Sequence, residues 1–157
     1  MKKIFKLTLL TFIVFIIVGC TKKETNLDGK LTDIMKELYK GINEEDVLEL
    51  EQTKVTKKNQ SYYLGDVTFE YKEALASEPL MSSVAHSVVL VRLKSSNDAE
   101  KAKKEIKEKV DPAKWICVSV EDKNVLVESK GDLVLLVMDN EVASKIKDNF
   151  LNLGTSK

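Results

Sequence analysis

His86 is the one histidine in this chain of 157 residues, and three serines lie close to it in the sequence, at positions 82, 83 and 87. A histidine that takes the proton of a serine hydroxyl can make that serine a nucleophile, which is the chemistry of serine hydrolases. The segment lacks the Gly-x-Ser-x-Gly turn that presents the nucleophile in α/β-hydrolases. We therefore favour a packed or hydrogen-bonded His86 on a strand. A small envelope hydrolase that uses Ser87 or Ser83 with His86 is the alternative.

The residue types also give little support to a metal or cofactor site. One histidine is too few for zinc motifs that need two. The acidic stretch from Glu44 to Glu51 lacks the alternating oxygen ligands and the turn glycine of a calcium loop, so we interpret it as a solvated loop or helix face. The six glycines are scattered and form no phosphate-binding loop. We expect no metal, no other cofactor and no catalytic residues.

A cysteine and three aromatic residues are further candidates for a site. Cys117 lies between Ile116 and Val118 on an expected strand, where a thiol behaves as a small buried hydrophobe. Trp115 and the pair Tyr62-Tyr63 are of the type that lines ligand grooves. Packing in the core for Trp115, and at a sheet edge for the tyrosines, is the interpretation that we favour.

The first twenty residues carry the most specific signal in the chain. Lys2, Lys3 and Lys6 form a positive segment, an uncharged apolar run of twelve residues follows from Leu7, and Gly19 directly precedes Cys20. This pattern resembles the bacterial lipobox. The resemblance implies cleavage before Cys20 and attachment of diacylglycerol to its thiol. Such a protein is held at the extracytoplasmic face of the cell membrane by its acyl chains.

The same segment has two other interpretations. A membrane-spanning helix needs about 20 apolar residues, and the run after Lys6 is too short for one. An ordinary secretory signal, with Cys20 unmodified, is the alternative to a lipoprotein signal. With Cys20 occupied by lipid, Cys117 has no cysteine to pair with and no intramolecular disulfide forms.

Composition limits the remainder to one small domain. Removing Lys2, Lys3 and Lys6 with the signal leaves 22 of the 25 basic residues against 25 acidic ones. No strongly basic face with interleaved aromatics is evident, so we expect no nucleic-acid partner. We expect a signal peptide at residues 1–19, the lipidated Cys20 with a flexible tether at 20–29, and one domain at 30–157. Eight tether residues give a root-mean-square reach of about 16 Å.

Periodicity predicts the elements of that domain. Apolar residues at helical spacing predict helices at Lys30–Lys40, at Asn97–Lys109 and after a cap at Asp139 or Asn140. Val84–Leu93 and Leu133–Val137 contain unbroken apolar runs, which predict interior strands that are neighbours or near-neighbours in the sheet. The other expected strands are Ser61–Leu64, Asp66–Tyr71, Trp115–Val120, Asn124–Glu128 and Asp132–Met138, the last three forming a β-meander. The segment Thr53–Gln60 is expected to be a connection, and Tyr71–Ser77 has the composition of a helix.

The order of these elements sets the expected fold class. From Val84 onward the chain runs strand, helix, strands, helix. That order favours an α+β fold: a single mixed or antiparallel sheet of about four to five strands, with helices packed against it.

Separated motifs between residues 62 and 150 resemble a known family. The motifs are Tyr62–Gly65, Glu78–Ser83, His86–Arg92, Asp111–Val118 and Gly131–Leu133. They resemble a family of small uncharacterised lipoproteins of clostridia and related Gram-positive bacteria. The family is a domain of unknown function, so the resemblance implies a cell-envelope location and no catalytic residues. Taken together, the sequence favours a non-enzymatic, membrane-tethered module that binds a protein, a peptide or a wall component.

Overall fold

The computed structural model describes residues 26–43, 45–47 and 49–155. The expected signal peptide, Cys20 and most of the tether lie outside these residues.

Within the described residues, five strands form one antiparallel sheet in the order β1-β2-β3-β5-β4. The α+β fold class is therefore confirmed, and the sheet is antiparallel throughout. The strands are β1 (Leu50–Lys54), β2 (Tyr71–Pro79), β3 (His86–Leu93), β4 (Val125–Lys130) and β5 (Leu133–Asp139).

Of the three interior strands, β3 and β5 are the most buried, and they form the centre of the molecule. They pair directly, with His86 opposite Asp139 at one end and Arg92 opposite Leu133 at the other. Every residue of β5, and every residue of β3 except Arg92, is buried. The prediction that these runs form neighbouring or near-neighbouring interior strands is confirmed by this pairing. Cover on both faces accounts for their unbroken apolar character.

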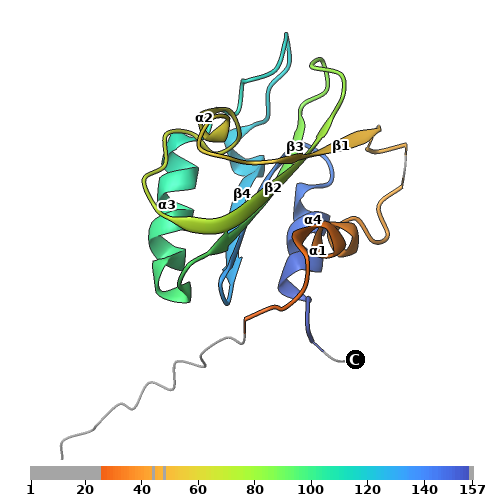
Figure 1. The fold of residues 1–157 in the computed structure, drawn as a ribbon. Coiled ribbons are helices and arrows are strands. Elements are labelled where there is room, and N and C mark those ends of the chain that lie inside the picture. Colours follow the sequence, from red (N-terminus) through yellow and green to blue (C-terminus); the bar gives the residue numbers. More distant parts are fainter. Residues whose placement is uncertain (1–25, 44, 48, 156–157) are drawn as a thin grey trace, which may run out of the picture.

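Helices supply that cover from both sides (Figure 1). Helix α3 (Ala99–Lys109) and the short α2 (Gln60–Leu64) pack on one face, which we call the α3 face. Helices α1 (Leu31–Leu38) and α4 (Ala143–Leu151) pack on the other, the α4 face. Short 3₁₀ turns, Ser96–Asp98 and Asp122–Asn124, precede α3 and β4.

The three predicted helices are present, with shifted boundaries. Helix α3 starts at Ala99, and it is the hydroxyl of Ser95 that accepts the N–H of Asn97 at 3.2 Å in the preceding turn. Asn97, the predicted first residue of the helix, lies in the 3₁₀ turn that precedes it. The side chain of Asp139 does support the start of α4, as described below.

Three predictions around residues 61–77 were wrong. Asp66–Tyr71, predicted to be a strand, lies outside the sheet except for Tyr71, the first residue of β2. Tyr71–Ser77 is strand β2 and not a helix, since pairing on both sides with β1 and β3 outweighs helix-forming composition. Its Ala74 and Ala76 pack on the α3 face, whereas Leu75 packs on the α4 face. Ser61–Leu64, predicted to be extended, lies in helix α2, which ends where Gly65 adopts a positive φ of 75°. The two ends of the expected connection Thr53–Gln60 also lie in regular elements: Thr53 belongs to β1 and Gln60 to α2.

The segment Trp115–Val120 is a loop, so the predicted three-stranded meander reduces to the hairpin β4–β5. Cys117 has a positive φ of 60°, which is incompatible with a regular strand. Its side chain is exposed, and the prediction of a buried thiol was wrong. The N–H of Ile116 instead donates to the carbonyl of Ser82, at 2.9 Å, which joins this loop to the β2–β3 turn.

Arg92 fixes the start of the described chain at one end of the sheet. Its guanidinium donates to the backbone carbonyls of Leu27 at 2.7 Å and Gly29 at 2.8 Å. It also pairs with Glu73 at 3.0 Å and Asp132 at 3.4 Å. We call this the tether end. The opposite end, where β2 finishes and β3 begins, is the loop end, and its two projecting turns are visible in Figure 1.

The double-sided cover of β3 and β5 should be visible in hydrogen exchange. We expect the amides of Val89 and Leu136 to exchange slowest, because their opening requires loss of the whole fold. Amides on the outer edge of β1, such as that of Gln52, should exchange far faster. Exchange of β3 or β5 at the rate of β1 would contradict this arrangement.

Candidate functional site

Two polar clusters lie at the loop end, one on each face of the sheet. They arise because successive residues of a strand point to opposite faces, so His86 and Ser87 diverge at the start of β3. His86 faces α1 and α4, and Ser87 faces α2 and the loop after α3.

His86 is the centre of the cluster on the α4 face. The side chain is 2% exposed. Its Nδ1 lies 2.8 Å from the carboxylate of Asp139, its cross-strand neighbour, and its Nε2 lies 2.9 Å from the hydroxyl of Tyr39. An ionised carboxylate only accepts, so Nδ1 carries the proton and donates to Asp139. In the neutral ring, Nε2 then accepts from the Tyr39 hydroxyl, whose pKa is raised by burial.

Asp139 links this cluster to helix α4. One carboxylate oxygen accepts from His86, and the other accepts the N–H groups of Glu141 at 2.7 Å and Val142 at 2.6 Å. Burial would raise the pKa of Asp139, but the hydrogen bonds from His86 and from these two amides outweigh burial and lower the pKa below its ordinary value. The carboxylate is therefore held in its charged form by fixed donors.

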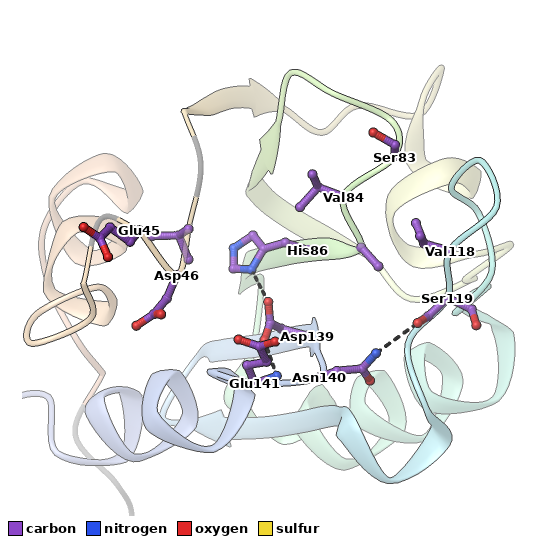
Figure 2. A pocket seen from close by; sticks show the side chains of 12 residues that line it. Glu45, Asp46, Ser83, Val84, His86, Val118, Ser119, Asp139, Asn140 and Glu141 are labelled. Atoms are coloured by element: carbon purple, nitrogen blue, oxygen red, sulfur yellow. Dashed lines mark hydrogen bonds and ion pairs between the residues drawn. The ribbon is translucent and has the colours of Figure 1, made fainter.

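A cavity of about 550 Å³ opens beside His86 (Figure 2). Asp139 lies at its floor, with Glu45, Asp46 and Glu141 around it. No lysine or arginine is among the described residues that line it. The other lining residues are Val47, Ser83, Val84, Ala85, Val118, Ser119 and Asn140. The cavity is thus rich in carboxylates and open to solvent.

The structure does not bring together the serines and the histidine of the hydrolase hypothesis. Ser87 lies on the opposite face from His86, and its hydroxyl donates to Glu78 at 2.5 Å. Ser83 lines the same cavity as His86, and Figure 2 shows its side chain pointing away from the ring. Both ring nitrogens of His86 are already used by Asp139 and Tyr39. The expectation of a hydrogen-bonded sheet histidine is confirmed.

Lys114 is the centre of the cluster on the α3 face. Its Nζ lies 2.5 Å from Glu78 and 3.4 Å from the hydroxyl of Ser87, and only 4% of the side chain is exposed. The ammonium group also lies 4.3 Å from the ring centroid of Tyr62 and 5.2 Å from those of Tyr63 and Trp115. Burial lowers the pKa of Lys114, and the charge of Glu78 opposes that change. Three rings and one carboxylate therefore enclose a buried cation.

This cluster explains the aromatic residues singled out in the sequence. Trp115 is buried in the core, as expected, and Tyr63 is half-buried. Tyr62 donates to Glu78 at 3.3 Å, and burial together with the charge of Glu78 raises the pKa of Tyr62 to about 12. The enclosure of Lys114 was missed, because a single lysine between an alanine and a tryptophan has no sequence signature.

Four large apolar side chains are exposed above this cluster. We call them the apolar tip: Tyr62 (45% exposed), Leu80 (66%), Met81 (54%) and Ile116 (63%). A cavity of about 430 Å³, lined by Glu49, Pro79, Leu80 and Met81, lies beside them. The buried pair Glu78–Lys114 and the backbone bond from Ile116 to Ser82 hold the backbone beneath this surface.

The described residues offer no obvious metal centre. Among them, no group of three or more histidine, cysteine or acidic side chains converges as metal ligands would, the carboxylates of the larger cavity included. None of the helices in the described part of the chain is long and apolar enough to cross a bilayer.

No family model matches this sequence, and neither curated proteins nor solved structures yield a match. Function must therefore be argued from the geometry of the loop end and from the sequence.

The His86 cluster should act on stability. We expect His86→Gln to lower the free energy of unfolding by about 1–3 kcal/mol, because it breaks buried hydrogen bonds. Ser83→Ala, which alters the same cavity without these bonds, is the matched control. Unfolding in urea measures both variants. Ester hydrolysis by the wild-type chain that His86→Gln abolishes without loss of stability would contradict this role.

Asp139 should make the free energy of unfolding depend on pH in a defined direction. Its pKa is lowered on folding, so its contribution is complete above the unfolded carboxyl pKa of about 4 and is lost as the pH falls through the folded value. We expect Asp139→Asn to be less stable at pH 7 and to lose less further stability on acidification. Equal acid sensitivity of the two proteins would refute this assignment.

The buried pair Glu78–Lys114 should show strong coupling. Lys114→Met leaves Glu78 buried without its cation and should cost about 3–5 kcal/mol. The double variant with Glu78→Gln should lose clearly less than the sum of the single changes. The exposed pair Lys123–Glu121 serves as control, and Lys123→Met should change stability little. Additive losses at Glu78 and Lys114 would show that the pair is not coupled.

Proposed function

We propose that this protein is a lipid-anchored, extracytoplasmic binding module whose recognition surface is the loop end. The observation that supports this most strongly is that the two ends of the sheet carry different features. The described chain starts at the tether end, where Arg92 holds Leu27 and Gly29. The cavity beside His86, the cavity beside Leu80 and the apolar tip lie at the other end.

The two ends are separated by the length of β3. Six residue steps from Arg92 to His86, at about 3.3 Å each, place the loop end about 20 Å from the clamp at Arg92. If Cys20 carries the lipid, the tether joins the membrane to the Arg92 end. The loop end then faces away from the membrane, toward the wall or the surfaces of other proteins.

The contacts at the loop end favour binding over catalysis. His86 is engaged in buried bonds with Asp139 and Tyr39, and Lys114 is engaged with Glu78. The exposed groups at the loop end include apolar side chains, carboxylates and the thiol of Cys117. A surface of this kind, backed by a fixed framework, is suited to recognition. No contact among the described residues favours the alternative hydrolase with Ser87 or Ser83 and His86.

The family resemblance supports the same proposal. Three of the segments that carry it, Tyr62–Gly65, Glu78–Ser83 and Asp111–Val118, contribute side chains to the Lys114 cluster or to the apolar tip. We therefore propose that the chain is a member of that Gram-positive lipoprotein family. In this proposal no nucleic acid is a partner, and the membrane is contacted through diacylglycerol on Cys20.

The anchor is tested by Cys20→Ala. We expect the variant to lose the acyl mass and to leave the membrane fraction, because acyl chains supply the anchoring free energy. Intact-mass analysis and detergent partitioning measure both effects. Cys117→Ala, which removes the other cysteine, should keep the wild-type mass shift and location. A Cys20→Ala chain that keeps the acyl mass and stays in the membrane fraction would refute the lipid anchor.

A further inference from the structure

We propose that the loop end binds an extended peptide segment carrying aliphatic and basic side chains, and that this segment pairs as an added strand with the outer edge of β1. The inference rests on the proposed function, since it takes the loop end as the recognition surface. It adds the partner's chemistry and its mode of binding.

The hydrogen-bond register shows which backbone groups of β1 face outward. The N–H of Leu80 donates to the carbonyl of Glu49, and the N–H of Val55 donates to that of Ala74. In an antiparallel pair, hydrogen-bonded positions alternate, so Glu51 and Thr53 also point their backbone groups toward β2. The register places Pro79, which has no N–H, opposite Leu50, where no N–H is needed.

The outward positions of β1 are therefore Leu50, Gln52 and Lys54. In the described part of the chain, β1 is the last strand on this side of the sheet. The side chains of Gln52 and Lys54 are exposed. Their N–H and C=O groups form a short edge of the kind that peptide-binding domains extend by strand addition. The charges of Glu51 and Lys54 restrict which strands can pair there.

An apolar anchor site lies directly beside this edge. Glu49, which precedes β1, lines the 430 Å³ cavity together with Pro79, Leu80 and Met81. Leu80 and Met81 are more than half exposed, although apolar side chains of this size are usually buried. A strand paired with β1 reaches the cavity at its end, where an aliphatic side chain can cover both residues.

The charge around the edge selects the partner. Glu45, Asp46, Glu49 and Glu51 are exposed at the loop end. No lysine or arginine is among the described residues lining either cavity there. Basic side chains that flank an aliphatic anchor complement this surface.

The same charges argue against insertion of the apolar tip into a membrane. An anionic bilayer would repel the surrounding carboxylates. In the proposed orientation the tip also faces away from the membrane that holds the anchor. A peptide segment is therefore the occupant that we infer.

Selection from a random heptapeptide library tests the chemistry. The probe is the library, displayed on phage, and the target is the purified full chain in detergent. We expect enrichment of peptides that contain lysine or arginine with leucine, isoleucine or valine. Enrichment of acidic peptides would overturn the inference. Enrichment on the wild-type chain that does not exceed enrichment on Leu80→Asp would also overturn it.

N-methylation of the best selected peptide tests the binding mode. Each N-methyl group removes one donor, and in an added strand only alternate N–H groups face β1. We expect affinity to fall about tenfold at alternate positions, corresponding to about 1.4 kcal/mol, and little between them. Loss without this alternation would overturn strand addition.

A matched pair of variants tests the edge from the protein side. Gln52→Pro removes one outward N–H, whereas Gln52→Ala keeps it. We expect only the proline variant to lose binding, with thermal melting used to show that it folds. The N-methyl series decides the mode if it does not fold.

The outcomes separate this inference from the proposed function. If Leu80→Asp abolishes peptide binding while Gln52→Pro leaves it intact, the loop end is a binding surface but strand addition fails. If neither variant matters, the proposed surface itself fails. Leu151→Asp, on an exposed apolar residue of α4, is the control. Flotation with phosphatidylglycerol vesicles that depends on Leu80 would assign the surface to a membrane. Dimers that Gln52→Pro dissociates would assign it to a second copy of the chain.

Discussion

The structure depends on one constraint: β3 and β5 are apolar on both faces, so the sheet needs a helical layer on each side. Helix α3 supplies one layer, and α1 with α4 supplies the other. The same constraint separates neighbouring polar residues. His86 and Ser87 are adjacent in the chain, yet each joins a different cluster under a different layer. Polar residues that are adjacent in the sequence are therefore placed in different clusters by the sheet.

The fold class and its centre were predictable for this reason. Unbroken apolar runs predicted β3 and β5, and helical spacing predicted α1, α3 and α4. The errors fell where tertiary pairing opposes local composition. The segment Tyr71–Ser77 contains helix-forming residues, but two neighbouring strands hold it extended. The positive φ of Cys117 interrupts an apolar stretch that otherwise has the pattern of a strand.

The candidate site was predictable only in part. The absence of a serine-hydrolase elbow in the sequence pointed to a structural role for His86, and its contacts with Asp139 and Tyr39 agree with that role. The enclosure of Lys114 was not predictable, because its partners come from α2, β2 and the loop after α3. The exposure of Leu80, Met81 and Ile116 was not predictable either, because a pattern of residue types does not show which apolar side chains remain in solvent.

We propose that the recognition surface faces away from the membrane to which the protein is anchored. Fluorescence quenching by lipids with spin-labelled headgroups measures this orientation directly. The lipidated chain carries Cys117→Ser and is inserted into vesicles. A single dye is attached to a cysteine introduced by Met81→Cys or by Lys72→Cys. Lys72 lies near the start of β2, toward the tether end, and Met81 lies at the loop end. We expect weak quenching at position 81 and stronger quenching at position 72. Stronger quenching at position 81 would contradict it.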